Sequence, residues 1–236
     1  MIDIHSHILP GLDHGARGWE ESLDMCRQAV DDGIGVMAAT PHVSEAYPNT
    51  EESILTVADE LRRRLGDAGI PLEIVVGGDY HIRPDLASEN VLTLNRNGRY
   101  FLLEFPYEVV PPNADTFVEI LIQKRGLVPV ITHPERIYSL HGREDKLQKM
   151  VEKGALVQIT GDSLTGAFGP PCRQSAERML RKGLVHVIAS DAHWSDQRPP
   201  LLSASRTAAA RIVGAEAARK LVQDNPRAII DGRDLP

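Results

Sequence analysis

Seven short runs of apolar and β-branched residues recur along this chain, and amphipathic segments separate them. Runs of this length between turn residues are typical of strands, and strands that alternate with helices favour a parallel sheet. Seven repeats of the unit indicate a barrel, while an open doubly wound sheet remains an alternative. The expected strands are Ile2–His7, Ile34–Ala39, Leu72–Val76, Tyr100–Phe105, Leu127–Thr132, Ala155–Thr160 and Leu184–Ser190.

The segments between these runs have apolar residues at helical spacing, and most of them end at a glycine, a common residue just after a helix. Leu23, Cys26 and Val30 form one such stripe before Gly33. No linker, repeat or low-complexity tract divides the sequence, so we expect residues 1–236 to form a single domain. The expected helices are Trp19–Asp32, Glu51–Ala68, Asn113–Lys124, Glu144–Lys153, Pro171–Lys182 and Ser203–Val222.

The composition excludes some classes of function. The net charge of −7 argues against broad nucleic-acid binding, which needs a basic surface. No apolar run is long enough for a membrane span, and the first residues lack the basic segment of a secretory signal. Cys26 and Cys172 form no Cys-x-x-Cys pattern, which suits a reducing compartment. We therefore expect a cytoplasmic protein without membrane insertion.

Six of the seven expected strands end with a histidine or a carboxylate. His5 and His7 are two apart on the first strand, so they project to the same side. In a parallel barrel the carboxyl ends of the strands meet on one face, where active sites form. Imidazole and carboxylate groups gathered there would bind several divalent metals. The candidate ligands are His5, His7, His42, His81, Glu104, His133, Asp191 and His193.

Arg136 and Arg198 each follow a candidate histidine ligand closely. A guanidinium group binds phosphate through parallel hydrogen bonds, so arginines beside a metal cluster favour a phosphate substrate. The alternative is that these arginines form salt bridges with Glu135 or Asp196.

Cys172 and Arg178 fit the Cys-x5-Arg pattern of thiol-dependent phosphatases. That chemistry needs a loop whose backbone N–H groups surround the phosphate. Pro170 and Pro171 precede the cysteine, and the residues between Cys172 and Arg178 include no glycine, so the segment favours a helix. We therefore expect Cys172 to take no part in catalysis.

Five short motifs follow one another along the chain: His5-Ser6-His7, Ala39-Thr40-Pro41-His42, Glu104-Phe105-Pro106, His133-Pro134-Glu135-Arg136 and Ala189-Ser190-Asp191-Ala192-His193. Together they resemble the PHP (polymerase and histidinol phosphatase) superfamily. More narrowly, they resemble the bacterial manganese-dependent protein-tyrosine phosphatases of capsule and exopolysaccharide loci. The resemblance extends over nearly the whole chain in the same order.

The resemblance implies a distorted TIM-like (β/α)7 barrel with three divalent metals, usually Mn²⁺, with iron, cobalt or zinc as alternatives. It implies hydrolysis of phosphotyrosine on proteins, and the expected partner is the tail of a bacterial tyrosine autokinase that controls capsule or exopolysaccharide synthesis. Arg136 and Arg198 would stabilise the phosphoryl oxygens. Two alternatives remain at this point: a small-molecule phosphomonoesterase for histidinol phosphate or nucleotides, and a non-catalytic binding module of the PHP fold.

The chain departs from the family pattern at two positions. The family usually has Gly-Gln-Glu-Ile-Arg where this chain has Asp79-Tyr80-His81-Ile82-Arg83. With Ile82-Arg83 as the anchor, His81 replaces a ligand glutamate, and an imidazole cannot bridge two metals as a carboxylate can. The second departure is His14, where the family commonly has aspartate, while Asp13 is retained.

Overall fold

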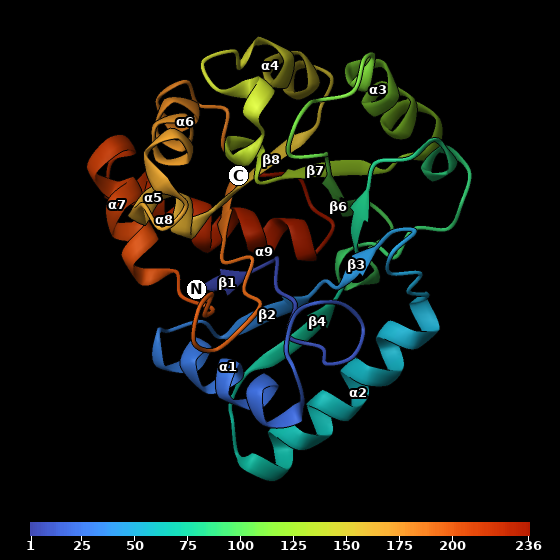
Figure 1. The fold of residues 1–236 in the computed structure, drawn as a ribbon, viewed down its shortest axis with the longest axis vertical. Helices are drawn as coiled ribbons and strands as arrows, with labels where there is room; N and C mark the ends of the chain where they lie inside the picture. The colour runs from blue at the N-terminus through green and yellow to red at the C-terminus, as the bar shows by residue number, and fades with distance from the viewer.

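The computed structural model describes residues 1–236, and every pair of neighbouring strands in its sheets is parallel (Figure 1). The strands are β1 (Ile2–Asp3), β2 (Val36–Ala39), β3 (His42–Val43), β4 (Glu73–Val76), β5 (Asp79–His81), β6 (Tyr100–Glu104), β7 (Val128–Thr132), β8 (Leu156–Thr160) and β9 (Val187–Ala189). They form a three-stranded sheet in the order β1-β2-β4 and a six-stranded sheet in the order β3-β5-β6-β7-β8-β9.

The two sheets are parts of one distorted barrel. The chain passes from β2 into β3 and from β4 into β5 after short interruptions, and the Asp79 N–H donates to the Pro41 carbonyl at 3.0 Å across them. Ser6 and Ala192 form an isolated parallel bridge that joins the first strand to the last. The expected distorted TIM-like barrel is thus confirmed, with β3 and β5 as additions that the hydrophobic pattern did not indicate.

Most helices lie around the outside of the strands, whereas the last helix of the chain crosses the middle of the view (Figure 1). Short 3₁₀ turns cover 84–87, 94–96, 134–136 and 138–140. None of the helices is both long and apolar enough to cross a membrane. The α-helices are α1 (Trp19–Asp31), α2 (Glu51–Ala68), α3 (Ala114–Arg125), α4 (Asp145–Glu152), α5 (Gly161–Thr165), α6 (Gly169–Arg181), α7 (Ser203–Val213), α8 (Ala215–Val222) and α9 (Asp224–Ile230).

The expectation of one long helix over Ser203–Val222 is wrong. Gly214 has φ +88° and separates α7 from α8, because a residue without Cβ accepts this backbone conformation easily. The alanine-rich sequence on both sides has high helix propensity and gives no sign of the break. The following helix α9 was not expected either.

The barrel interior is apolar at the end opposite the carboxyl ends of the strands. Ile4, Leu102, Val130 and Val187 belong to an interior cluster of 14 buried residues, and Ile229 of α9 joins them. A larger cluster of 49 buried residues packs the strands against the outer helices. Side chains alternate along a strand, so residues two apart point to the same side. Because Leu102 points into the barrel, the carboxylate of Glu104 points inward as well.

Helix α2 begins with a capping box that offers a test of local stability. The Thr50 hydroxyl accepts a hydrogen bond from the Ser53 N–H at 3.1 Å, and the Ser53 hydroxyl accepts from the Thr50 N–H at 3.0 Å. Thr50→Ala should lower the free energy of unfolding by about 1 kcal/mol. In a thermal melt the midpoint should fall by about 2–4 °C.

Thr56→Ala is the matched control on the same helix. Thr56 is exposed in the helix interior, and its hydroxyl only donates back to the Glu52 carbonyl. Alanine has the higher helix propensity there, so this variant should melt at the original temperature or slightly above it. An equal loss of stability in both variants would contradict the capping argument.

Candidate metal centre

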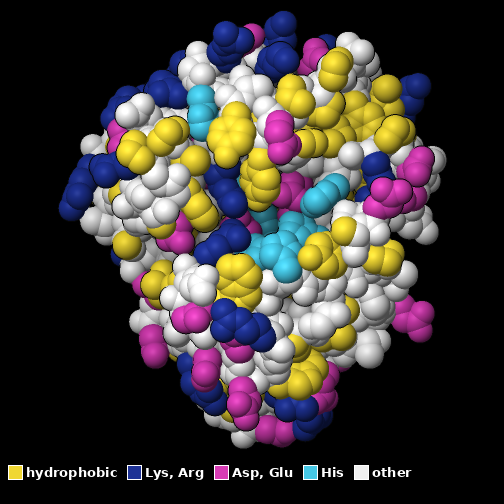
Figure 2. Space-filling view, in the orientation of Figure 1, with side chains coloured by type: hydrophobic (Ala, Val, Ile, Leu, Met, Phe, Trp, Pro, Cys, Tyr) yellow, Lys and Arg dark blue, Asp and Glu magenta, His cyan; other side chains and the backbone are white.

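Imidazole and carboxylate side chains from six strand ends meet in one hollow of the surface. Figure 2 shows histidine side chains gathered there, with arginine or lysine side chains beside them. Every member is less than 9% exposed, so the group is buried at the base of the hollow. We call it the histidine–carboxylate cluster: His5, His7, His42, Asp79, Glu104, His133, Asp191 and His193.

One part of the cluster joins the first strand to the last. The Nε2 atoms of His5 and His7 are 3.1 Å apart. Asp191 Oδ1 lies 3.5 Å from each of them, and Asp79 Oδ2 lies 3.5 Å from His5 Nε2. These nitrogen and oxygen atoms face a common point, as the ligands of a divalent metal do.

Glu104 is the centre of a second part. Its Oε1 lies 3.4 Å from His133 Nε2, and its Oε2 lies 3.4 Å from His42 Nδ1. His81 Nε2 pairs with the same Oε2 atom, but the His81 side chain is 49% exposed, unlike the cluster members. Asp79 Oδ2 lies 3.3 Å from His42 Nδ1 and so links this part to the first.

A third part consists of imidazoles only. The rings of His7 and His193 have centroids 4.0 Å apart, and His42 completes a set of three donors. His14 adds a fourth ring, because its Nε2 lies 3.1 Å from His193 Nε2. Its ring also stacks on that of His42, with centroids 5.1 Å apart and an angle of 13°.

The donor atoms fit divalent metals. Four sets of three donors each lie within 4.8 Å of one another. Both carboxylate oxygens of Asp79 and Nδ1 of His133 are buried without a hydrogen-bond partner, and such groups are costly to bury unless something else binds them. The sets are His5/His7/Asp79, Asp79/Glu104/His133, His42/His81/Glu104 and His7/His42/His193.

Other side chains hold the ligand histidines in position. His5 Nδ1 lies 2.8 Å from Gln158 Oε1, and His7 Nδ1 lies 2.6 Å from Asp13 Oδ2. Hydrogen bonds at Nδ1 fix the ring orientation and leave Nε2 free to face a metal. Asp13 Oδ2 also accepts from the His42 N–H at 3.0 Å, so one carboxylate aligns two strand ends.

Asp3 ties the first strand to the last just below the cluster. It accepts hydrogen bonds from the Ser190 N–H at 3.0 Å, from the Ser190 hydroxyl, and from the His5 N–H at 3.3 Å. Burial raises the pKa of Asp3 to about 6, although these donors oppose the rise. These hydrogen bonds fix the strand ends that carry His5 and Asp191.

The electrostatic surroundings keep His133 neutral. Burial and the nearby Arg136 guanidinium lower the pKa of His133 to about 4. A neutral imidazole retains the lone pair that a metal requires, so no proton competes at neutral pH.

Both candidate arginines contact the cluster directly. Arg136 Nη1 donates to Asp191 Oδ2 at 2.7 Å, and Arg198 Nη2 donates to the same oxygen. The predicted alternatives, Glu135 and Asp196, are not their partners. Glu135 accepts from the Ser163 hydroxyl and the Thr160 N–H, and Asp196 pairs with Arg17.

Asp79, a member of two of the donor sets, was not among the candidate ligands predicted from the sequence. Asp79 ends the Gly77-Gly78-Asp79 stretch at a strand terminus, which is the same signal that identified the other candidates. Residues 79 and 81 are two apart on β5, but Asp79 is fully buried while His81 lies at the rim. Asp79 supplies a carboxylate to the cluster from the same strand that carries His81.

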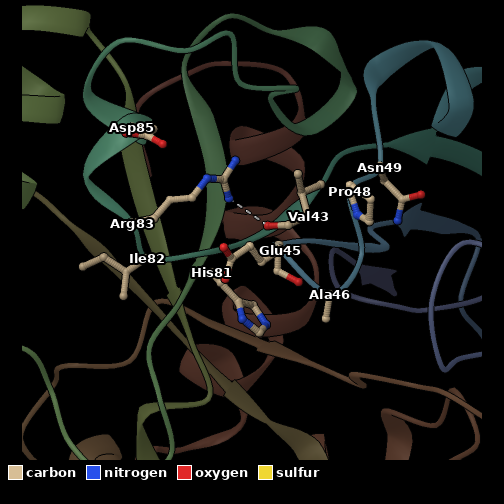
Figure 3. Close-up of a pocket in the computed structure, with 10 residues that line it drawn as sticks. Val43, Glu45, Ala46, Pro48, Asn49, His81, Ile82, Arg83 and Asp85 are labelled. Atoms are coloured by element: carbon tan, nitrogen blue, oxygen red, sulfur yellow. Dashed lines mark hydrogen bonds between the residues drawn. The ribbon is translucent and has the colours of Figure 1, made fainter.

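His81 also borders an open pocket outside the cluster. Figure 3 shows this pocket, with His81 and Arg83 from one chain segment and Val43 from another. The Arg83 guanidinium donates to the Val43 carbonyl at 3.0 Å and pairs with Glu89. His81 therefore lies between the metal-binding donors and a surface that a larger molecule can reach.

Cys172 lies in the first turns of α6, as expected. Burial raises the pKa of its thiol. A helical backbone cannot form the anion-binding loop of a thiol-dependent phosphatase, so the Cys-x5-Arg pattern has no such role here.

The chain is a parallel α/β barrel whose strand ends carry a buried cluster of histidines and carboxylates that could hold metal ions. The chain belongs to the CpsB/CapC family of capsular polysaccharide synthesis, whose family model matches residues 1–231. The resemblance inferred from the motifs is thereby confirmed.

Individual relatives agree with this assignment. The chain is 41% identical over 198 residues to tyrosine-protein phosphatase YwqE of Bacillus subtilis (strain 168), covering 82% of this chain and 77% of the relative. It is 30% identical over 240 residues to tyrosine-protein phosphatase CpsB of Streptococcus pneumoniae, covering 98% of each.

A solved structure is also closely similar. It comes from work on YwqE from Bacillus subtilis and CpsB from Streptococcus pneumoniae, described as unique metal-dependent tyrosine phosphatases. The TM-score is 0.94 at 35% identity, and the match covers 100% of this chain and 96% of the other.

The burial difference between Asp79 and His81 leads to a prediction about metal content. Asp79→Asn keeps the side-chain volume but removes the charge, so it should lose at least one metal per chain. His81→Ala removes a rim donor and should weaken the retention of one metal by about tenfold. Mass spectrometry of the metal-loaded proteins under native conditions measures both effects.

His141→Ala is the matched control. His141 bonds to the Glu135 carbonyl at 2.8 Å and lies outside the cluster. Its metal content should equal that of the original protein. A full metal complement in Asp79→Asn would remove Asp79 from the ligand set, and an unchanged affinity in His81→Ala would remove His81.

Proposed function

We propose that this chain is a metal-dependent phosphatase that hydrolyses phosphotyrosine on proteins. The observation that carries the proposal is the convergence of Arg136 and Arg198 on one oxygen of Asp191, at the edge of the histidine–carboxylate cluster. Two guanidinium groups beside a metal centre form a site for a phosphoryl group. The names of the relatives supply the tyrosine part of the proposal.

The proposed ligands are the members of the histidine–carboxylate cluster together with His81 and His14. They would hold three divalent metals, with Mn²⁺ as the proposed natural ion and iron, cobalt or zinc as alternatives. Carboxylates in the set suit Mn²⁺, whereas the imidazole-only part suits metals that prefer nitrogen. Metals bound here would polarise the phosphoryl oxygens and lower the pKa of water.

Arg136 and Arg198 would bind the equatorial oxygens of the transferring phosphoryl group and stabilise its charge. Their side chains are only 14% and 16% exposed, so water screens them little. Asp191 now holds both groups in position, and its second oxygen faces His5 and His7. A tyrosine leaving group has a pKa near 10, so protonation by a general acid matters less than for an alkyl ester.

The proposed physiological substrate is the tail of a bacterial tyrosine autokinase that controls capsule or exopolysaccharide synthesis. The family description supports the connection with capsular polysaccharide. We propose that residues 1–236 act as one phosphatase domain in the cytoplasm. The pocket next to His81 offers space for polypeptide that adjoins the phosphorylated residue.

Metal removal and restoration test the activity. After treatment with EDTA, hydrolysis of a phosphotyrosine peptide should fall to background, and separate addition of Mn²⁺, Fe²⁺, Co²⁺ or Zn²⁺ should restore it, with Mn²⁺ most effective. The metal-free protein should also melt at a lower temperature, since a ligand that binds only the folded state stabilises it. Histidinol phosphate and free nucleotides serve as comparison substrates, and preference for either would refute the phosphotyrosine assignment.

Substitution of the arginines tests the phosphoryl site. Arg136→Ala and Arg198→Ala should each lower kcat/KM by about 10²–10⁴-fold while metal content stays normal, because transition-state charge loses a donor. Arg143→Ala, at an exposed position nearby in sequence, should keep full activity. Retention of normal kcat/KM in both cluster-facing variants would show that the guanidinium groups do not bind the phosphoryl oxygens.

A further inference from the structure

Two aromatic rings lie against the arginine pair. Tyr107 follows β6, and Phe168 lies just before α6. The Arg136 guanidinium carbon is 4.9 Å from the Tyr107 ring centre and 4.3 Å from that of Phe168. The Arg198 guanidinium carbon is 5.4 Å from the Phe168 ring centre. Both rings are therefore within cation–π distance of the groups proposed to bind phosphate.

Tyr107 also contacts the cluster itself. Its ring stacks on that of His133, with centroids 5.5 Å apart and an angle of 25°. Yet the residue remains 38% exposed, one of only four large hydrophobic residues with this degree of exposure. Figure 2 shows hydrophobic side chains at the border of the hollow beside the histidine and basic side chains. An aromatic surface left in water at this point gains little for folding, because hydrophobic stabilisation follows the area removed from water.

We infer that Tyr107 and Phe168 form an aromatic wall that receives the phenyl ring of phosphotyrosine and thereby selects aryl over alkyl phosphates. This inference rests on the proposed function. In an aryl phosphate a single ester oxygen joins the phosphorus to the ring. If Arg136 and Arg198 hold the phosphoryl oxygens, the substrate ring must lie next to them, where the two side-chain rings are.

Aromatic rings favour each other in offset or edge-to-face arrangements, and the contact adds to the area that both rings bury. An alkyl ester at the same position has no ring to place there. The wall thus acts on the group beyond the ester oxygen, whereas the arginines act on the phosphoryl group that all substrates share.

Two phosphonates that cannot be hydrolysed separate these contributions. Phenylphosphonate and methylphosphonate present the same anionic group, with and without a ring. Calorimetry on the metal-loaded protein gives the two dissociation constants, and their ratio reports the wall alone. We expect phenylphosphonate to bind at least tenfold more tightly, which is the range of an aromatic contact plus the area it buries.

Phe168→Leu and Tyr107→Leu should each reduce this ratio by about five- to tenfold, with methylphosphonate binding nearly unchanged. Tyr107→Phe should keep the ratio, because the ring and not the hydroxyl makes the contact. Tyr138→Leu is the matched control, since Tyr138 is 69% exposed and packs on His141, not on an arginine. Because Tyr107 is partly exposed, its leucine variant keeps the test valid even if Phe168→Leu fails to fold.

A ratio near one in the original protein, or an unchanged ratio in the Tyr107→Leu variant, would overturn the inference. Equal weakening of both phosphonates would also overturn it, because the rings would then only position the arginines. The proposed function has a separate outcome. If phosphotyrosine is hydrolysed but the phosphonate ratio is unchanged in the leucine variants, the proposed function stands and the aromatic wall is rejected. If the ratio depends on the ring but no hydrolysis occurs, the wall stands and the proposed function is rejected.

Discussion

The Asp191 carboxylate is the group on which both halves of the site depend. Oδ1 lies 3.5 Å from the Nε2 atoms of His5 and His7, and Oδ2 accepts from Arg136 and Arg198. Burial opposes its ionisation, but Arg198 and His5 hold the pKa of Asp191 well below its usual range. A single buried anion therefore links His5 and His7 to the two arginines proposed to bind phosphate. Its backbone has φ +54°, an uncommon conformation that the surrounding bonds must maintain.

Those bonds come from strand ends that are distant in sequence. The Asp191 N–H donates to the His5 carbonyl at 2.9 Å, and the Asp3 carboxylate accepts a hydrogen bond from the Ser190 N–H. Where the two sheets meet, the Asp79 N–H donates to the Pro41 carbonyl, and Asp79 Oδ2 lies 3.3 Å from His42 Nδ1. The cluster is thus assembled where the first strand meets the last and where the two sheets join.

Much of this could be predicted because strand ends in a parallel barrel converge whatever the details of packing. That rule identified His5, Glu104 and Asp191 without any contact information. It could not rank Asp79 against His81, since both follow the same expected strand two residues apart, and the burial of Asp79 becomes visible only in the structure. The partners of Arg136 and Arg198 depend on loop conformation. Glu135 and Asp196, which lie close to these arginines in sequence, pair with other groups. Gly214 likewise breaks a helix at a residue whose effect depends on the tertiary path.

The bond between Asp3 and Ser190 has a consequence for how the protein is made. Asp191 and His193 are synthesised 186 residues after His5 and His7, respectively. At typical rates of synthesis the interval is roughly ten to forty seconds. During this interval His5 and His7 belong to a barrel that cannot yet close. The cluster can therefore assemble only after Asp191 and His193 have been made, so a product that ends before Asp191 carries His5 and His7 without the rest of the cluster.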